Sequence, residues 1–477
     1  MSLDTAISNA ASGLASVNRQ LALVSQNVAN AGTPGYAREV AANSDATAGG
    51  IGAGVRTGPA TREVNAQLQA SLSTQDAAVA GQQVRAQAFA AIDATQGVTA
   101  AGNDLASQLG TLRDAFTTLS TAPDNQAQQR QVILDAGTLA RGINATANAI
   151  QAGRQAAQDG IRSDVATLNA TLQTIGTLSD QIISQAAQGQ STADLENQRD
   201  GQQQTAAQIA GLRFLPQPNG DVLAFTAQGR AVALRTASGP FAIADATVGA
   251  NAAYPGGLPA LTLSGVDVTA QVTDGRIGAN LDLRDTTLPG QQAGLDEFAK
   301  TLANRLSGQG LALFTDPAGA VPAGGGTPAQ AGYVGFANII GINPAVAAKP
   351  SLVRDGTQAV AGSITGASAF TPNPAGGPAG FTTLITRVTD QAFGAEAQPG
   401  VPQAAPATVG LGVGEPCRCP MAGLAASAIW RPAWSARSRR LRPPRPATSP
   451  PARRCRRRLR PSCNRRPAYP STRSCPP

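Results

Sequence analysis

Residues 3–36 read LDTAISNAASGLASVNRQLALVSQNVANAGTPGY, and apolar residues recur in them at alternating steps of four and three. A repeat of 3.5 residues is typical of a helix that packs against another helix in a coiled coil. The residues between are mainly Ser, Asn, Gln and Ala, so the apolar stripe is narrow. We therefore expect a helix over 3–28 that needs a partner to cover its stripe. The stripe consists of Leu3, Ile7, Ala10, Leu14, Val17, Leu21, Val24 and Val28.

The sequence after this helix predicts where it ends. Asn30 and Gly32 suit a helix C-terminus, and Pro34-Gly35 suits a turn in which glycine takes a positive φ. A helix buried within its own domain is the alternative interpretation of residues 3–28. The regular repeat, which precedes any obvious core, favours a helix that associates with others.

Composition separates the chain into two parts and excludes several classes of protein. The 477 residues include no His, which excludes Ser-His-Asp and Cys-His catalysis and zinc sites built on imidazole. No apolar run is long enough to span a membrane, and the N-terminus lacks the pattern of a cleavable signal peptide. All five Cys and 16 of the 37 basic residues lie after position 414, so the residues before that position are Cys-free and mildly acidic.

The rest of the chain predicts a mainly α protein with an inserted β domain. Residues 46–210 are expected to form a helical domain, because the 4-3 rhythm returns between Ile161 and Ile182. Period-two patterns and the turn Asn219-Gly220-Asp221 predict a β domain over 211–290. A helix with Leu295, Leu302 and Leu306 on one face opens the return segment, 291–394. A linker over 395–414 and the basic tail 415–477 follow, and residues 1–45 hold the first helix and its turn.

Two further motifs have a catalytic interpretation and a simpler one. The glycines at 49–54 lack the strand and helix context of a phosphate-binding loop, so a turn is expected. Asp194-Leu195-Glu196-Asn197-Gln198-Arg199-Asp200 contains acids and a base, but exposed i,i+4 charge pairs are the better interpretation. No acid, base or nucleophile stands at a catalytic spacing, so we predict no enzyme activity, cofactor or metal.

Several of these segments resemble the bacterial flagellar axial proteins, which include rod, hook and hook-associated proteins. Ser12-Gly13-Leu14, then Ser25 to Asn30, then Thr33, Pro34, Gly35 and Tyr36 resemble the family's N-terminal motif. Residues 194–200 resemble its DLxxQRD signature, and residues 275–285 resemble its GxxGGxLDxRD passage. The order of the segments is most similar to the hook-associated protein 1 family, and hook or rod proteins are the near alternative.

The resemblance implies a structural role. It implies self-association in a ring or tube at the junction of hook and filament, with hook protein and a second junction protein or flagellin as partners. It also implies an export chaperone and secretion through the flagellar type III apparatus, without nucleic-acid binding or membrane insertion. The expected assembly interface consists of Leu3, Ile7, Leu14, Val17, Leu21, Val24, Asn27, Val28 and Asn30.

The tail 415–477 departs from this family, whose members end in a helix that pairs with the first one. Frequent prolines forbid a continuous helix in the tail. Arg453 to Arg458 could bind nucleic acid, which is the distant alternative function, and Cys417-x-Cys419 is at most half of a metal site. We interpret the tail as the product of a shifted reading frame, because a shifted back-translation of its end resembles the start of the missing helix.

Overall fold

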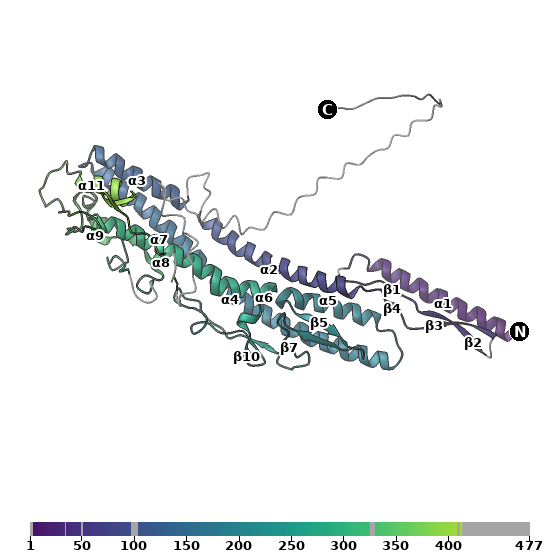
Figure 1. Cartoon of the computed structure of the whole chain (residues 1–477). Helices are drawn as coiled ribbons and strands as arrows, with labels where there is room; N and C mark the ends of the chain where they lie inside the picture. The colour runs from purple at the N-terminus through teal and green to yellow at the C-terminus, as the bar shows by residue number, and fades with distance from the viewer. Residues whose placement is uncertain are drawn as a thin grey trace, which may run out of the picture.

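The computed structural model describes residues 3–33, 35–48, 51–96, 104–324, 330–407 and 411–412. Together they form a long, mainly helical rod, with α1 at one end and α3 and α11 near the other (Figure 1). The mainly α fold with an inserted β region is confirmed. Pro34 of the predicted turn and the tail 415–477 lie outside the described residues.

The N-terminal unit, residues 3–62, consists of one long helix and two small antiparallel sheets. The helix ends as predicted, and Gly35 in the following turn has a φ of +81°. The unit extends beyond the predicted boundary at 45, because the strands that pair with its first two strands come later in the chain. Its elements are α1 (Leu3–Ala29), β1 (Glu39–Val40), β2 (Asn43–Ala48), β3 (Ile51–Thr57) and β4 (Thr61–Arg62), with β1 paired to β4 and β2 paired to β3.

Four helices follow and form the helical body. The longest has 62 residues and is capped by Asn125, whose side chain accepts hydrogen bonds from the N–H groups of Ala127 and Gln128. The buried side chains of that helix, including Ile161 and Ile182, follow the predicted rhythm along its length. The helices are α2 (Ala66–Gln96), α3 (Leu105–Thr121), α4 (Gln126–Ala187) and α5 (Ala193–Ala210).

The β region lies against the helical body rather than apart from it. The predicted hairpin is present, with Phe214 opposite Ala224 and a φ of +90° at Gly220. Its buried residues share one apolar cluster with α4 and α5, so part of the α4 stripe packs on strands instead of on helices. The strands form two three-stranded sheets, β5 (Arg213–Pro216), β6 (Val222–Phe225) and β7 (Ala231–Val232), and β8 (Phe241–Ala242), β9 (Thr262–Leu263) and β10 (Val266–Asp267).

The chain returns to the helices earlier than the predicted boundary at 290. Helix α6 (Gly275–Asp282) runs through a π-helical turn into α7 (Leu288–Gly308). The buried face of α6 completes the apolar cluster on α4, so these residues pack with the helices. Arg284 in that turn is fully buried, and two of its nitrogens lie 2.7 and 2.8 Å from the carboxylate oxygens of Asp285. A third bond, of 2.6 Å, joins it to Gln158 of α4.

A second apolar cluster fills the far end of the rod. It joins α3 and the first half of α4 to α7 and the segments after it, and Leu302 and Leu306 are buried there as predicted. The described residues of the predicted linker 395–414 include a hairpin, and Leu411 is buried beside Ala293 at this end of the rod. The elements are β11 (Phe314–Thr315), α8 (Phe336–Ile339), β12 (Gly341–Ile342), α9 (Pro344–Ala348), α10 (Leu352–Asp355), α11 (Thr383–Arg387), β13 (Glu396–Gln398) and β14 (Val401–Pro402).

Candidate assembly interface

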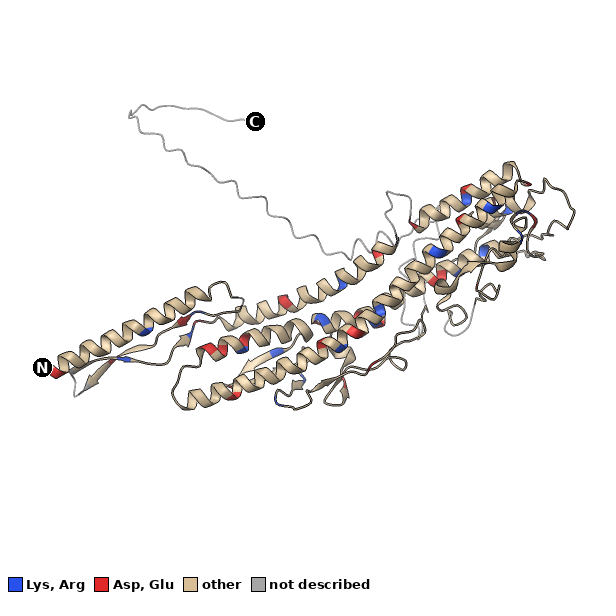
Figure 2. Cartoon of the chain, turned by 180° about the vertical axis from the view of Figure 1, so that it is seen from behind, with Lys and Arg blue, Asp and Glu red and all other residues tan. Residues whose placement is uncertain are grey.

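The apolar stripe of α1 is exposed along its whole length, and we call it the ribbon. Its seven large side chains are between 56% and 77% exposed. The helix carries only two charged residues, Asp4 and Arg19 (Figure 2). Soluble proteins rarely leave so long an apolar row in water, so the ribbon is a surface suited to a partner. Its large members are Leu3, Ile7, Leu14, Val17, Leu21, Val24 and Val28.

The opposite, polar face of α1 packs against β3. Ser16 is buried there, and the Ser12 hydroxyl accepts a hydrogen bond of 3.2 Å from the N–H of Val55. Gly54 allows this close approach, because a Cβ at that position would lie 2.2 Å from the Ser12 oxygen. Residues 51–54, for which a turn was expected, belong instead to strand β3, and residues 49–50 lie outside the described residues. Strand β3 contacts the polar face of α1 and leaves the apolar one free.

Asn27 and Asn30, which we expected at the interface with other subunits, form hydrogen bonds within the chain. The Asn27 amide donates to the carbonyl of Glu39 at 2.8 Å and accepts from the N–H of Glu39 at 2.9 Å. The Tyr36 hydroxyl also donates to Asn27, at 2.9 Å. Asn30 donates to the carbonyl of Gln26 at 3.1 Å. Asn27 therefore ties the end of α1 to β1, and Asn30 bonds a carbonyl of the last turn of its own helix.

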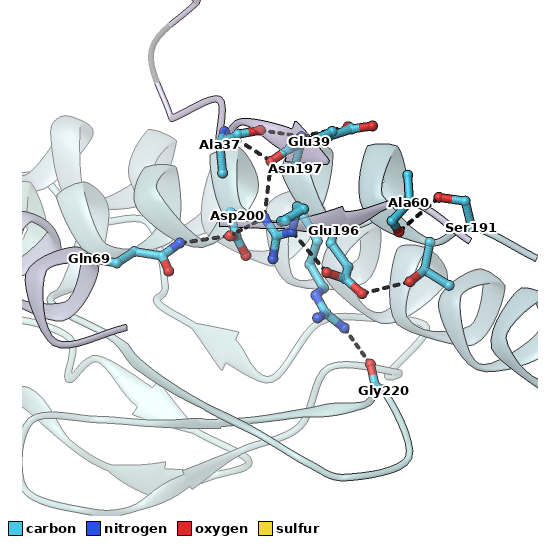
Figure 3. A network of polar contacts seen from close by, with 12 residues as sticks. Ala37, Glu39, Ala60, Gln69, Ser191, Glu196, Asn197, Asp200 and Gly220 are labelled. Carbon is cyan, nitrogen blue, oxygen red and sulfur yellow. Dashed lines mark hydrogen bonds and ion pairs between the residues drawn. The ribbon is translucent and has the colours of Figure 1, made fainter. Parts of the chain in front are cut away.

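The segment 194–200 lies in α5 and contacts the N-terminal unit. Its charged side chains therefore do not form the exposed pairs that we expected. Arg62 of β4 lies 2.8 Å from Glu196 and 2.7 Å from Asp200 (Figure 3). The Arg62 and Asp200 side chains are 10% and 9% exposed. The acids pair with an arginine from another element because β4 lies across that face of α5, which sequence spacing alone does not reveal.

Asn197 completes these contacts, and we call Arg62, Glu196, Asn197 and Asp200 the docking network. The Asn197 amide accepts from the N–H of Ala37 at 3.1 Å and donates to the carbonyl of Ala37 at 3.2 Å. It also bonds Arg62 at 3.1 Å and Glu39 at 3.0 Å.

Glu39 is buried between the N-terminal unit and α5, and we expect the contact between them to depend on pH. Burial, followed by the nearby Asp194, raises the pKa of the Glu39 carboxyl. The contribution of Glu39 to the stability of this contact is therefore present below the ordinary pKa of a glutamate. It is lost as the pH rises through the raised pKa of Glu39 in the folded chain. Glu39→Gln, which keeps the oxygen that Asn197 contacts, should increase the amide-exchange protection of β1 at pH 7 but not at pH 4. Glu63→Gln, on an exposed side chain, is the control, and equal effects of the two variants would refute the assignment.

A second exposed apolar row lies on the first half of α2 and was not predicted as an interface. Leu68, Leu72 and Val79 are 68%, 50% and 53% exposed. They follow one another at steps of four and seven, and seven is the sum of one step of four and one of three in the ribbon. The same periodicity search would therefore have found them.

Over the part of the chain that the structure describes, no three or more Cys, Asp or Glu side chains come together as metal ligands could. Nor does any described helix have the length and apolar character needed to cross a membrane.

Comparison with known proteins identifies the central part of the chain. Residues 89–317 match the family model for the helical domain of flagellar hook-associated protein FlgK. No curated protein matches the chain. Among solved structures, it is similar to the flagellar hook junction protein FlgK from Burkholderia pseudomallei, with 22% identity and a TM-score of 0.42 over 54% of this chain and 46% of that one. The family match covers just under half of the chain and leaves out the N-terminal motif on which the resemblance first rested; over that central part it supports a FlgK-like flagellar hook-associated protein.

Proposed function

We propose that the chain is a structural subunit of the junction between the flagellar hook and the filament. The observation that carries this proposal is the ribbon of α1, which is exposed along all of its length while the opposite face packs on β3. The family consists of structural flagellar proteins rather than enzymes. A subunit that offers a row of apolar side chains at coiled-coil spacing is suited to repeated packing against copies of itself.

In this proposal the ribbons of neighbouring subunits pack together as the inner layer of a tube. The occupant of each ribbon is an α1 helix of another subunit, because the 3.5-residue spacing matches that of an identical helix. Each Leu or Val that becomes buried contributes on the order of 1.5–3 kcal/mol. The helical body, which has its own apolar clusters, then lies outside that layer.

The proposed partners follow from this position in the flagellum. Hook protein lies on one side of the layer, and a second junction protein or flagellin lies on the other. Delivery uses the flagellar type III apparatus and an export chaperone. We expect the tail 415–477 to be the product of a shifted reading frame, so incorporation of this chain should be weak.

The test of the proposal is complementation in a motile bacterium that lacks its own junction protein. This chain should restore few filaments, and a version with the shifted reading frame corrected should restore many, scored by motility and by electron microscopy of hook ends. A corrected chain that is exported and yet never found at hook ends would refute the proposal.

A further inference from the structure

The N-terminal unit and the helical body are joined without an apolar core between them. Among the described residues, none of 3–62 belongs to either of the two large apolar clusters. The ribbon faces away, and the α1 helix packs mainly on β3 and β1 of its own unit. What remains across the boundary is a set of hydrogen bonds and ion pairs with α5, including a bond from Gln26 to Asp194.

Two asparagines, one from each of two helices, hold the same short segment. Asn27 of α1 makes paired hydrogen bonds with the backbone of Glu39, and Asn197 of α5 makes paired bonds with the backbone of Ala37. Each amide therefore reproduces the donor and acceptor pair of a neighbouring strand. The segment 37–39 is thereby fixed to both helices at once, which couples the direction of α1 to that of α5.

Arg62 adds the charged part of this connection. Its guanidinium contacts Glu196, Asp200 and Asn197, which are labelled in Figure 3, and its side chain is 10% exposed. Hydrogen bonds with a planar guanidinium depend on direction as well as distance, whereas apolar contact does not. A boundary built from such bonds therefore defines the angle between the N-terminal unit and the helical body.

We propose that the docking network sets the angle at which α1 and its ribbon project from the helical body, with Arg62 and Asn197 as the positioning residues. A tube requires every subunit to present its ribbon in one direction, so loss of this angle should impair assembly while the helical body stays folded. The consequence for assembly rests on the proposed function, but the angle itself is a property of the single chain.

The angle can be measured in the full chain because all five Cys lie in the tail, where Ser can replace them. Spin labels on Asn18→Cys in α1 and Gln181→Cys in α4, both exposed, report the distance between the two units by double electron–electron resonance. With the network intact we expect a single narrow distance distribution. Arg62→Met should abolish the narrow peak, and Arg62→Lys, which keeps the charge, should recover part of it.

The Arg62→Met chain should still fold, because each former partner keeps another bond. Asp200 retains Gln69 at 2.7 Å, and Glu196 retains Thr192 at 2.7 Å. Arg38→Met is the matched control, because Arg38 is an exposed arginine of the same unit whose partner Glu63 lies 3.5 Å away. Circular dichroism should show the same helix content for both variants.

Asn197→Ala provides a second route, since it removes the paired bonds to Ala37 and should also broaden the distribution. The proposal is overturned if the distribution is broad in the unchanged chain, or if Arg62→Met and Asn197→Ala both keep the narrow peak. A narrow peak in both variants, together with normal filament formation by the frame-corrected chain, would refute the positioning role and leave the proposed function intact. If the distance distribution broadens in both variants but no version of the chain forms filaments, the positioning role stands and the proposed function is refuted.

Discussion

Replacing Leu14 and Leu21 of the ribbon with Glu should weaken self-association of the chain by about 100-fold or more. The two side chains are each 64% exposed in the single chain, so the substitutions should barely affect its folding. Burying both against another subunit contributes about 3–6 kcal/mol, and each 1.4 kcal/mol corresponds to about tenfold in affinity. The measurement is sedimentation velocity over a range of protein concentrations, with circular dichroism to follow folding.

The control places the same charges elsewhere on α1. Ala15→Glu and Ala22→Glu are also seven residues apart and exposed, but they lie outside the ribbon. They should leave association within a few-fold of the unchanged chain. If both pairs of variants weaken association equally, added charge and not loss of the ribbon explains the effect. If the unchanged chain stays monomeric at every concentration, the ribbon is not a self-association surface.

Arg284→Ala should destabilise the helical body by about 3–5 kcal/mol, the usual effect of removing one partner of a buried ion pair. The side chain is fully buried, and its loss leaves the Asp285 carboxylate, which is 12% exposed, without its partner. It also removes the bond to Gln158, one of the bonds that tie the π-helical turn to α4. The free energy of unfolding in urea, followed by circular dichroism, measures this loss.

An exposed pair of the same kind is the control. Arg162 and Asp245 lie 2.8 Å apart, but their side chains are 58% and 76% exposed, so Arg162→Ala should cost at most about 1 kcal/mol. Replacing both members of the buried pair, as Arg284→Met with Asp285→Leu, should recover part of the stability because no unpaired charge remains. Equal losses for Arg284→Ala and Arg162→Ala would show that the buried pair has no special role.

The ribbon could be predicted from the sequence because helix periodicity is local. The side chains from Leu3 to Val28 share one face of a helix whatever the rest of the chain does. The hairpin at Asn219-Gly220 and the buried stripe of α4 could be predicted for the same reason. Whether the ribbon serves assembly stays a prediction, since only a partner can cover it.

The docking network could not be predicted, because its partners are far apart in sequence. Arg62 meets Glu196 and Asp200 over more than 130 residues, and Asn197 meets Ala37 over 160. In the sequence, the charges of 194–200 are close only to each other, which led to the prediction of exposed i,i+4 pairs. That prediction was wrong. The same limit explains Asn27, whose backbone partner at Glu39 follows a turn whose direction the sequence does not specify.

Local pattern thus predicted the helices, the hairpin and the apolar row on α1. The tertiary structure decided what the polar residues do: the polar face of α1 contacts β3, and the signature 194–200 holds the N-terminal unit. The physical reason is that apolar periodicity is a property of one element, whereas a buried hydrogen bond or ion pair depends on where a second element places its donor and acceptor.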